Sequence, residues 1–338
     1  MSPMSQIKTR ILIISDTHAT SPHPPPAPHE FDTADLVTVI TGYRTPLPRA
    51  DVVLHCGDLT KRSSIPEYEA TFSMLRSLDA PLKLVIAGNH DLLLDAAFSS
   101  DEEASQAVER IIRDARADGV RYLSEGTHEF TLENGARLKV YASPYTPTYG
   151  SWAFQYPASH EFAIPPGVDV AMTHGPPYGV LDEAGILRHR GLSVHAGCRS
   201  LFKAVAFARP RVHCFGHIHE AWGAYRGAWL DRDAPGFEMS WPTKERVMNV
   251  DMSGPIQTMD ELRPMFAADT EETSPETRQK LAQLSEQRGY HIDWTEEKTR
   301  VGQGAETLFL NASIMDFGFR PSQLPWILDL HLPSESER

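Results

Sequence analysis

The chain has 338 residues, of which 41% are hydrophobic, enough for a sizeable core in one large domain or two ordinary ones. Its 45 acidic and 32 basic residues give a formal net charge of -13, which repels polyanions. The composition therefore excludes nucleic acid as the expected partner and favours a globular protein.

The number of cysteines and the lengths of the apolar runs indicate the cellular compartment of the protein. The 3 cysteines are an odd number and lie far apart, which predicts reduced thiols rather than a disulfide framework. The apolar run near the start is too short for a signal peptide and lacks a cleavage site of small residues. No stretch approaches the roughly 20 apolar residues of a membrane span. We expect a cytoplasmic protein, or a nuclear one, without a membrane partner.

Apolar runs rich in Val and Ile, each ending abruptly in polar residues, recur along the chain. Continuous runs of this kind predict strands buried on both faces. The runs cover residues 10–16, 50–58, 82–91, 168–175 and 210–219, and they return at 306–314 and 325–333. Helices are predicted between the runs, at residues 66–79, 101–119 and 196–210. This alternation predicts a layered α/β sandwich.

Two segments interrupt the alternation of strands and helices. Residues 126–144 predict a hairpin that turns at Asn134 and Gly135 and adds a second group of strands. Residues 20–30 are rich in proline and predict an extended surface loop after the first strand.

A third segment, residues 227–303, differs in composition from the rest. It is polar, contains an acidic stretch at 269–277 and offers one helix candidate at 274–289. We interpret it as a polar insertion in a single domain that covers residues 8–338. The insertion either shapes access to a site or is a surface elaboration, and its acidic stretch is a candidate for binding a partner protein.

The polar residues at the ends of the first five predicted strands are expected to lie close together. In open α/β sheets, ligands bind at the carboxyl ends of the strands. Those ends carry Asp16, His18, Asp58, Asn89, His90, His174, His217 and His219. Seven of the eight suit two borderline divalent metals, Mn, Fe or Zn rather than Ca or Mg, and leave one imidazole for a substrate. Asp58, in a Gly-Asp turn, is the natural bridging ligand.

These residues carry a resemblance to a known family. The blocks DTH, GD, GNHD, THG and GHIH, in this order between residues 16 and 219, resemble the signature of the calcineurin-like metallophosphoesterase superfamily. VIAGNHD, MTHGPPYGVLD, FGHIHEAWG and LFLNASI are similar to its metallophosphoesterase-domain-containing branch. The resemblance implies a four-layer α/β/β/α sandwich, in which two mixed sheets are flanked by helices.

The resemblance also implies roles for individual residues. One metal is expected on Asp16, His18, Asp58 and His219, and the second on Asp58, Asn89, His174 and His217. His90 then hydrogen-bonds the phosphoryl oxygen or protonates the leaving group. Asp91 either orients His90 and raises its pKa or is an ordinary carboxylate at a helix start.

The function expected from this resemblance is metal-dependent hydrolysis of phosphodiesters, such as cyclic nucleotides or other small esters, by a water activated between two metals. A phosphomonoesterase or phosphoprotein phosphatase is the alternative within the same chemistry. A metal-binding scaffold protein of low activity is the alternative from another class.

Several other residues have two interpretations each. Trp222, Trp229 and Trp241 either stack on a nucleobase or pack in the interior, and Tyr178 is a candidate for contact with the substrate. Four further histidines are assigned no function, and two of them are expected to be buried within strands. These four are His55, His189, His195 and His213.

Overall fold

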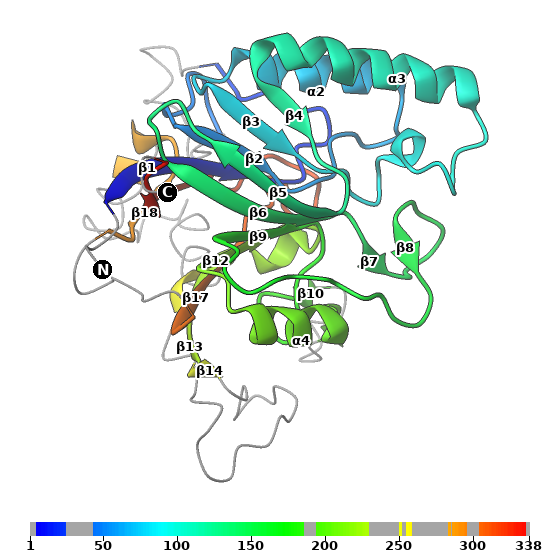
Figure 1. Cartoon of the computed structure of the whole chain (residues 1–338). Helices are drawn as coiled ribbons and strands as arrows, with labels where there is room; N and C mark the ends of the chain where they lie inside the picture. Colours follow the sequence, from blue (N-terminus) through cyan, green and yellow to red (C-terminus); the bar gives the residue numbers. More distant parts are fainter. Residues whose placement is uncertain are drawn as a thin grey trace, which may run out of the picture.

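Two mixed β-sheets face each other in this computed structural model, which describes residues 5–24, 43–185, 194–229, 250–251, 255–258, 283–284, 286–295 and 304–335 (Figure 1). The first sheet has six strands. In spatial order they are β16 (Tyr290–Asp293), β18 (Trp326–Pro333), β1 (Gln6–Ile14), β2 (Val52–His55), β3 (Leu82–Val85) and β4 (Val120–Tyr122). Only the β1–β18 pair is antiparallel in this sheet.

The second sheet has eight strands. In spatial order they are β14 (Val250–Asp251), β13 (Gly223–Trp229), β17 (Glu306–Asn311), β12 (Val212–Phe215), β9 (Val170–Thr173), β6 (Arg137–Ser143) and β5 (Gly126–Thr131), with β15 (Pro255–Thr258) also paired to β13. Its central strands β6, β9, β12 and β17 run parallel. Short strand pairs lie outside both sheets: β7 (Thr146–Pro147) with β8 (Gln155–Tyr156), and β10 (Glu183–Ala184) with β11 (Val194–His195).

Helices cover the outer faces of both sheets (Figure 1). They are α2 (Ile65–Ser77) and α3 (Glu102–Asp114) on the first sheet and α4 (Arg199–Ala208) on the second. Short 3-10 turns are η2 (Leu92–Leu94), η3 (Ala115–Asp118) and η5 (His219–Ala221). The layers are helix, sheet, sheet and helix, so the four-layer α/β/β/α sandwich that the sequence predicted is confirmed. In the part of the chain that the structure describes, no helix is long and apolar enough to cross a membrane.

Alternation along the buried strands explains the layers. In β1, Ile11 and Ile13 face the second sheet, whereas Leu12 and Ile14 face the helices and contact the cluster around Phe72. Side chains alternate between the two faces of a strand, so a continuous apolar run buries both faces. Burial of one such side chain contributes roughly 1.5–3 kcal/mol. The apolar runs therefore specify a sheet that is covered on both sides.

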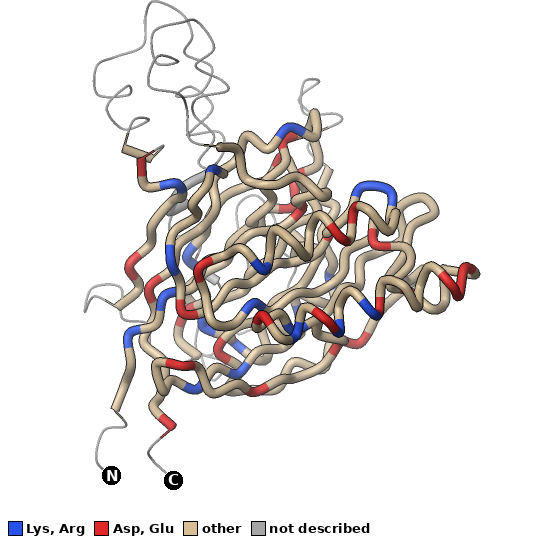
Figure 2. Tube along the Cα trace, turned by 90° about the horizontal axis from the view of Figure 1, so that it is seen from above, with Lys and Arg blue, Asp and Glu red and all other residues tan. Residues whose placement is uncertain are grey.

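The predicted helices have the caps that their sequences indicate. The backbone N–H of Ser64 donates to Glu67 Oε2 over 2.9 Å at the start of α2. The Asp101 side chain accepts from Ala104 N over 2.9 Å at the start of α3, and Gly119, with φ of 79°, ends the turn that follows. Each cap satisfies backbone groups that a helix end leaves unpaired. Acidic and basic residues are interspersed over this helical face (Figure 2).

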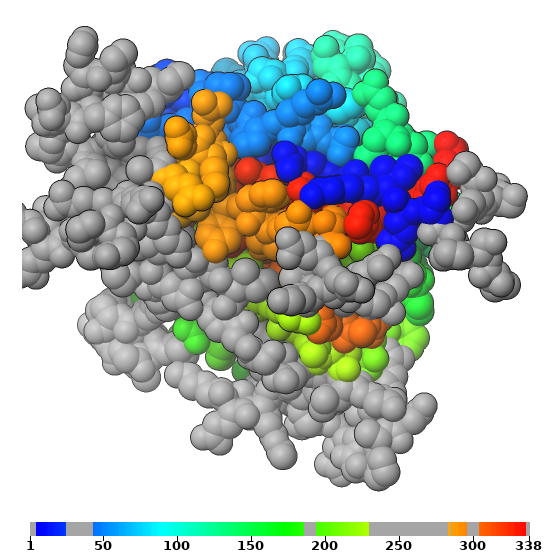
Figure 3. All heavy atoms as spheres, turned by 90° about the vertical axis from the view of Figure 1, so that its left-hand side faces the viewer, coloured from blue at the N-terminus to red at the C-terminus, as the bar shows by residue number. Residues whose placement is uncertain are grey.

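The predicted hairpin and the predicted last strand are both confirmed. Strands β5 and β6 pair antiparallel, and Gly135 adopts φ of 84° in the turn. Strand β18 lies between β1 and β16, and Figure 3 shows the blue N-terminal strand beside red and orange segments from the end of the sequence. Arg10 binds Asp329 through two hydrogen bonds of 2.7 and 2.9 Å across the β1–β18 pair. The two ends of the chain are thus joined in one sheet.

The polar insertion at 227–303 is described only in part. Its described pieces complete β13 and add β14, β15 and β16, so they extend both sheets at one edge. The acidic stretch at 269–277 lies outside the described residues, as does most of the helix candidate at 274–289. Of the proline-rich loop at 20–30, the structure describes residues 20–24. The roles expected for these segments stay predictions.

Two histidines in central strands are buried with half of their hydrogen-bonding capacity unused. His55 Nε2 pairs with Thr17 Oγ1, and His213 Nε2 pairs with Thr173 Oγ1, each over 2.9 Å. The Nδ1 atoms of both rings are buried without a partner. Burial lowers the pKa of His55 to about 4 and that of His213 to about 3. Both rings are neutral core residues, as the sequence predicted.

We predict that these two histidines make the fold sensitive to mild acid. The unfolded chain binds protons below pH of about 6.5, and the folded chain does not until about pH 4, so stability falls between these values. Each ring then contributes a slope of about 1.4 kcal/mol per pH unit. Urea unfolding at pH 7 and pH 5 should show a smaller loss of stability in His213→Leu, by about 2 kcal/mol. An identical loss in both proteins would contradict this assignment.

Candidate metal centre

Five strand ends from the two sheets meet at one edge of the sandwich. In the first sheet, β1 ends before Asp16 and His18, β2 before Asp58, and β3 before Asn89 and His90. In the second sheet, β9 ends before His174 and β12 before His217 and His219. The parallel pairing continues past the strand ends, with Asp16 N donating to Gly57 O and Gly216 N to His174 O. Strand register therefore brings these side chains together.

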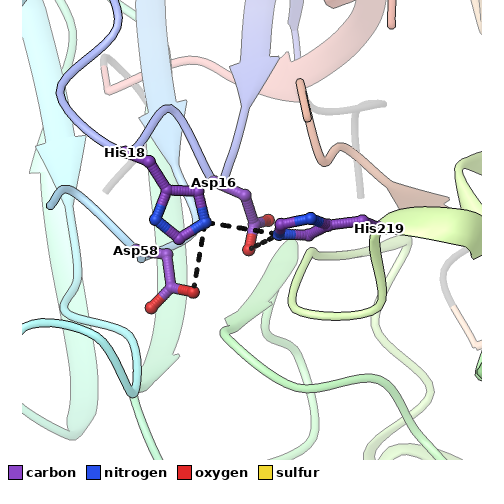
Figure 4. A group of neighbouring side chains, drawn as sticks. All are labelled: Asp16, His18, Asp58 and His219. Carbon is purple, nitrogen blue, oxygen red and sulfur yellow. Dashed lines mark hydrogen bonds and ion pairs between the residues drawn. The ribbon is translucent and has the colours of Figure 1, made fainter. Parts of the chain in front are cut away.

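Four of the predicted ligands form a compact buried group. Figure 4 shows Asp16, His18, Asp58 and His219 converging from three strand ends. Their ligand atoms all lie within 4.8 Å of one another. His18 Nε2 lies 3.3 Å from His219 Nε2 and 3.7 Å from Asp58 Oδ2, and His219 Nε2 lies 3.5 Å from Asp16 Oδ1. This is the set that the resemblance assigned to one metal.

The other predicted ligands form a second group on the far side of Asp58. His174 Nε2 lies 2.9 Å from Asn89 Oδ1 and 3.4 Å from Asp58 Oδ1. The ring of His217 lies 5.0 Å from the ring of His174, centroid to centroid. Asp58 thus turns Oδ2 toward the first group and Oδ1 toward the second. Its carboxylate has the position of a ligand shared by two ions.

Backbone carbonyls fix the orientation of three of these imidazoles. His18 Nδ1 donates to Thr60 O over 2.8 Å, His174 Nδ1 to Cys56 O over 2.9 Å, and His219 Nδ1 to Asp316 O over 3.2 Å. A carbonyl oxygen only accepts, so each Nδ1 carries a proton, and in the neutral ring Nε2 then has a free lone pair. The same arrangement orients metal-binding histidines in proteins.

These Nε2 atoms lie close to other atoms that can accept a hydrogen bond or bind a metal. The Nε2 atoms of His18 and His219 lie 3.3 Å apart, and Nε2 of His174 lies 2.9 Å from the Asn89 oxygen. Such pairs repel unless a cation lies between them. Bonds of about 2.1 Å to one ion place its ligands about 3.0–3.4 Å apart. The donor set and its spacing fit divalent metal ions.

Charge and burial lead to the same conclusion. Burial raises the pKa of Asp58 well above its usual range, and the nearby carboxylates of Asp16 and Asp91 raise it further. Burial also lowers the pKa values of His18, His174 and His217, the last to about 3. Although burial opposes it, the hydrogen bond and charge of Asp16 raise the pKa of His219, so this ring gives Asp16 a counter-charge while Asp58 faces only imidazoles of lowered pKa. A bound cation would supply a counter-charge to Asp58.

The backbone at the ligands is strained, and glycines make room for them. Asp16, His18, Asp58 and His217 all have positive φ, between 45° and 69°. Non-glycine residues adopt this conformation at a cost of about 1–2 kcal/mol, and it concentrates at functional sites. A Cβ on Gly216 would lie 1.9 Å from Asp16 Oδ2. The residue before a ligand must be glycine here because a carboxylate occupies the space.

His90 lies beside both groups, at the position predicted for a substrate-facing imidazole. Its backbone N–H donates to Asp58 Oδ1 over 2.8 Å, and its Nδ1 donates to Lys61 O over 2.8 Å. Nε2 is therefore the nitrogen left for a ligand. Burial lowers the pKa of the ring against the opposing effect of the Lys61 carbonyl.

The orienting role considered for Asp91 is corrected by the structure. The fully buried carboxylate of Asp91 accepts hydrogen bonds from the backbone N–H groups of Gly88, Leu59 and Thr60, over 2.8–3.1 Å, and from Thr60 Oγ1. It joins the turn after β2 to the turn after β3. Burial raises its pKa to about 6. The Lys61 carbonyl, rather than Asp91, orients the His90 ring.

The residues with two interpretations are mostly structural. Trp222 is buried and stacks on Trp326 with centroids 4.4 Å apart, and the buried Trp229 donates to Thr307 Oγ1 over 2.8 Å. Tyr178 lies under the guanidinium of Arg199, 4.0 Å from ring centroid to Cζ. His195 Nδ1 pairs with Asp182 over 2.7 Å. Trp241 and His189 lie outside the described residues.

Sequence reasoning missed two aromatic residues next to His90. The Trp152 ring lies 4.2 Å from the His90 ring, and the Phe319 ring lies 5.1 Å from that of His18. Phe319 follows β17, which runs parallel to β12, so the rule of strand ends could have found it. Trp152 lies on the loop between β7 and β8, and no sequence signal points to it.

Comparisons with known proteins show which family and which relatives this chain resembles. The model of the calcineurin-like phosphoesterase family matches residues 9–221. Over 225 residues the chain is 34% identical to the probable rhamnogalacturonate lyase C of Emericella nidulans, a match that covers 65% of this chain and 18% of that protein. Over 226 residues it is 30% identical to metallophosphoesterase domain-containing protein 1 of Homo sapiens, covering 60% and 65%.

A UPF0046 protein of Caenorhabditis elegans is 31% identical over 195 residues, a match that covers 52% of this chain and 48% of that protein. The chain therefore spans less than two thirds of the length of each of these three relatives.

Because Asp58 lies between the two groups of candidate ligands, its substitution should change metal binding differently from the substitution of a residue in one group. Asp58→Ala should reduce metal binding at both groups, because its two oxygens face different imidazoles. His174→Ala should affect only the group that contains Asn89. Metal content after dialysis, measured by mass spectrometry of the elements, should fall from two ions to one in the His174 variant and below one in the Asp58 variant. Equal losses in both variants would contradict a shared ligand.

Gly216 gives an independent prediction. In Gly216→Ala the new methyl group would collide with Asp16 Oδ2 and with Ser15 Oγ, 1.9 and 2.2 Å away, and displace the carboxylate. We expect metal affinity to fall by about 10-fold or more, as for other changes that disturb a ligand's supports. Isothermal titration with Mn tests this, with circular dichroism to confirm folding. Unchanged affinity in a folded variant would show that Asp16 is not a ligand.

Proposed function

The chain belongs to the calcineurin-like phosphoesterase family, and from this premise we propose that it hydrolyses phosphodiesters with the help of two divalent metal ions. The substrate is a small ester, such as a cyclic nucleotide. Mn, Fe or Zn suit the mixed carboxylate, imidazole and amide donors. The predicted ligands are Asp16, His18, Asp58, Asn89, His174, His217 and His219.

One observation carries the proposal: the Asp58 carboxylate lies between two groups of ligands. Its Oδ2 lies 3.7 Å from His18 Nε2, and its Oδ1 lies 3.4 Å from His174 Nε2. Two ions that share a site need an anion between them, because their charges repel. When bound, two such ions polarise a phosphoryl oxygen and lower the pKa of a water molecule.

The protein's own contribution to the reaction centres on His90. Its ring is held by the Lys61 carbonyl at Nδ1 and by contact with Trp152, so Nε2 points to one side in a fixed orientation. Nε2 can hydrogen-bond the phosphoryl oxygen, or it can carry a proton to the leaving group of the ester. Asp91 keeps the turns that carry Asp58 and His90 in register.

A phosphomonoesterase is the alternative within the same chemistry. A monoester carries two negative charges and needs more counter-charge than a diester, which carries one. Near His90, the basic side chain of Lys61 contacts the aromatic ring of Phe319. The sequence shows no separate basic motif for the second charge of a monoester, which favours the diester.

A metal-binding scaffold of low activity is the alternative from another class. The complete set of seven candidate ligands favours an enzyme, because a scaffold has no need to keep every ligand. Cytoplasmic location and a protein partner for the acidic stretch at 269–277 stay expectations from the sequence.

The test is hydrolysis of bis(p-nitrophenyl) phosphate by metal-free protein with and without added Mn. We predict Mn-dependent turnover that falls by about 10²-fold or more in His90→Ala, since positioned proton transfer contributes at least that much. His128→Ala, on the edge strand β5, is the matched control and should keep full activity. Circular dichroism confirms that both variants fold.

Two outcomes would change the proposal. A higher kcat/KM for p-nitrophenyl phosphate than for the diester would point to the phosphomonoesterase. Protein that binds two Mn ions and hydrolyses neither ester would point to the scaffold.

A further inference from the structure

Two aromatic side chains from distant parts of the chain flank His90. The half-buried Trp152 stacks on its ring with centroids 4.2 Å apart and planes 32° apart. The Phe319 ring approaches edge-on at 6.2 Å and also contacts the rings of His18 and His219, at 5.1 and 5.0 Å. The His90 ring thus has an indole and a phenyl group as neighbours.

The protein holds Phe319 in place against a backbone preference. Phe319 has φ of 56°, a conformation that costs a non-glycine residue about 1–2 kcal/mol. Asp316 offsets this cost: its carboxylate accepts from the N–H groups of Gly318 and Arg320 and binds the Arg320 guanidinium. The Asp316 carbonyl also accepts from His219 Nδ1. One residue therefore positions both a predicted metal ligand and the aromatic ring beside it.

Lys61 joins this arrangement from the turn after β2. Its carbonyl holds His90 Nδ1, and its ammonium lies 4.4 Å from the centroid of the Phe319 ring. A cation over an aromatic face contributes about 0.5–1 kcal/mol at an exposed site. The ring of Phe319 is thus restrained on one side by imidazoles and on another by an ammonium group.

We propose that Trp152 and Phe319 form an aromatic clamp that selects phosphate esters with a flat, π-bearing substituent on the side of His90. Phe319 leaves 38% of its surface exposed and Trp152 is half-buried, so both rings near His90 keep surface that a substituent can contact. A flat ring gains offset-stacked or edge-to-face contacts with such side chains, whereas a puckered alkyl ring gains only burial. The inference rests on the proposed function and names its substrate class.

The test compares two phosphonates that share a head group and are not hydrolysed. Phenylphosphonate is flat, and cyclohexylphosphonate is puckered and of similar size. Isothermal titration into the Mn-loaded protein should show tighter binding of phenylphosphonate by about 2- to 10-fold, the value of an aromatic pair. Trp152→Leu and Phe319→Leu should bring this ratio close to one, and Trp152→Phe should retain most of it.

Two further variants separate the clamp from charge and from general surface effects. Lys61→Met should weaken both phosphonates, because its charge attracts the shared head group, and should lower their ratio only slightly, because the imidazoles still restrain the Phe319 ring. Phe207→Leu, an aromatic residue on α4 that is 59% exposed, should leave both affinities unchanged.

The outcomes distinguish the clamp from the proposed function. Equal affinities for the two phosphonates, or no binding of either, would overturn the clamp even if bis(p-nitrophenyl) phosphate is hydrolysed. Preference for phenylphosphonate without hydrolysis of any ester would support the clamp and overturn the proposed diesterase. A preference that survives in both leucine variants would also overturn the clamp, because the selectivity would then come from other residues.

Discussion

Repulsion among buried acceptors is the constraint on which the rest of this structure depends. The carboxylates of Asp16 and Asp58 lie in the interior beside imidazoles whose Nε2 atoms approach one another to 3.3 Å. Such an arrangement is unfavourable without a cation. Because its members come from the strand ends of both sheets, a bound cation would also hold the two sheets together at this edge. Binding of a metal there would therefore also stabilise the sandwich.

Hydrogen bonds to the surrounding backbone fix the orientation of the candidate ligands. The carbonyls of Cys56, Thr60 and Asp316 fix which nitrogen of three imidazoles carries the proton. Asn311, at the end of β17, donates to Ile218 O between His217 and His219. Each of these carbonyl and amide groups lies in a different segment of the chain from the ligand that it holds. The geometry of the centre therefore depends on the register of the parallel strands and not only on the presence of the ligands.

The strand ends were predictable because two local signals coincide in them. Continuous apolar runs identify buried strands, and the polar residues after them must then lie at the carboxyl edge. This reasoning brought His174 and Asn89 together although 85 positions separate them. It did not say where Asp91 points, whose neighbour in sequence is His90 but whose carboxylate binds the turn after β2. Adjacent side chains at the end of a strand point in different directions, and the sequence does not show which partner each side chain contacts.

The sequence by itself determined the layered fold and the candidate ligands, because burial and residue type are properties of local pattern. Only the tertiary structure decided which oxygen of Asp58 faces which group, that the Lys61 carbonyl orients His90, and that the rings of Trp152 and Phe319 flank it. These facts depend on contacts between segments far apart in the chain. Such contacts follow from the packing of whole sheets and loops, which no single stretch of sequence encodes.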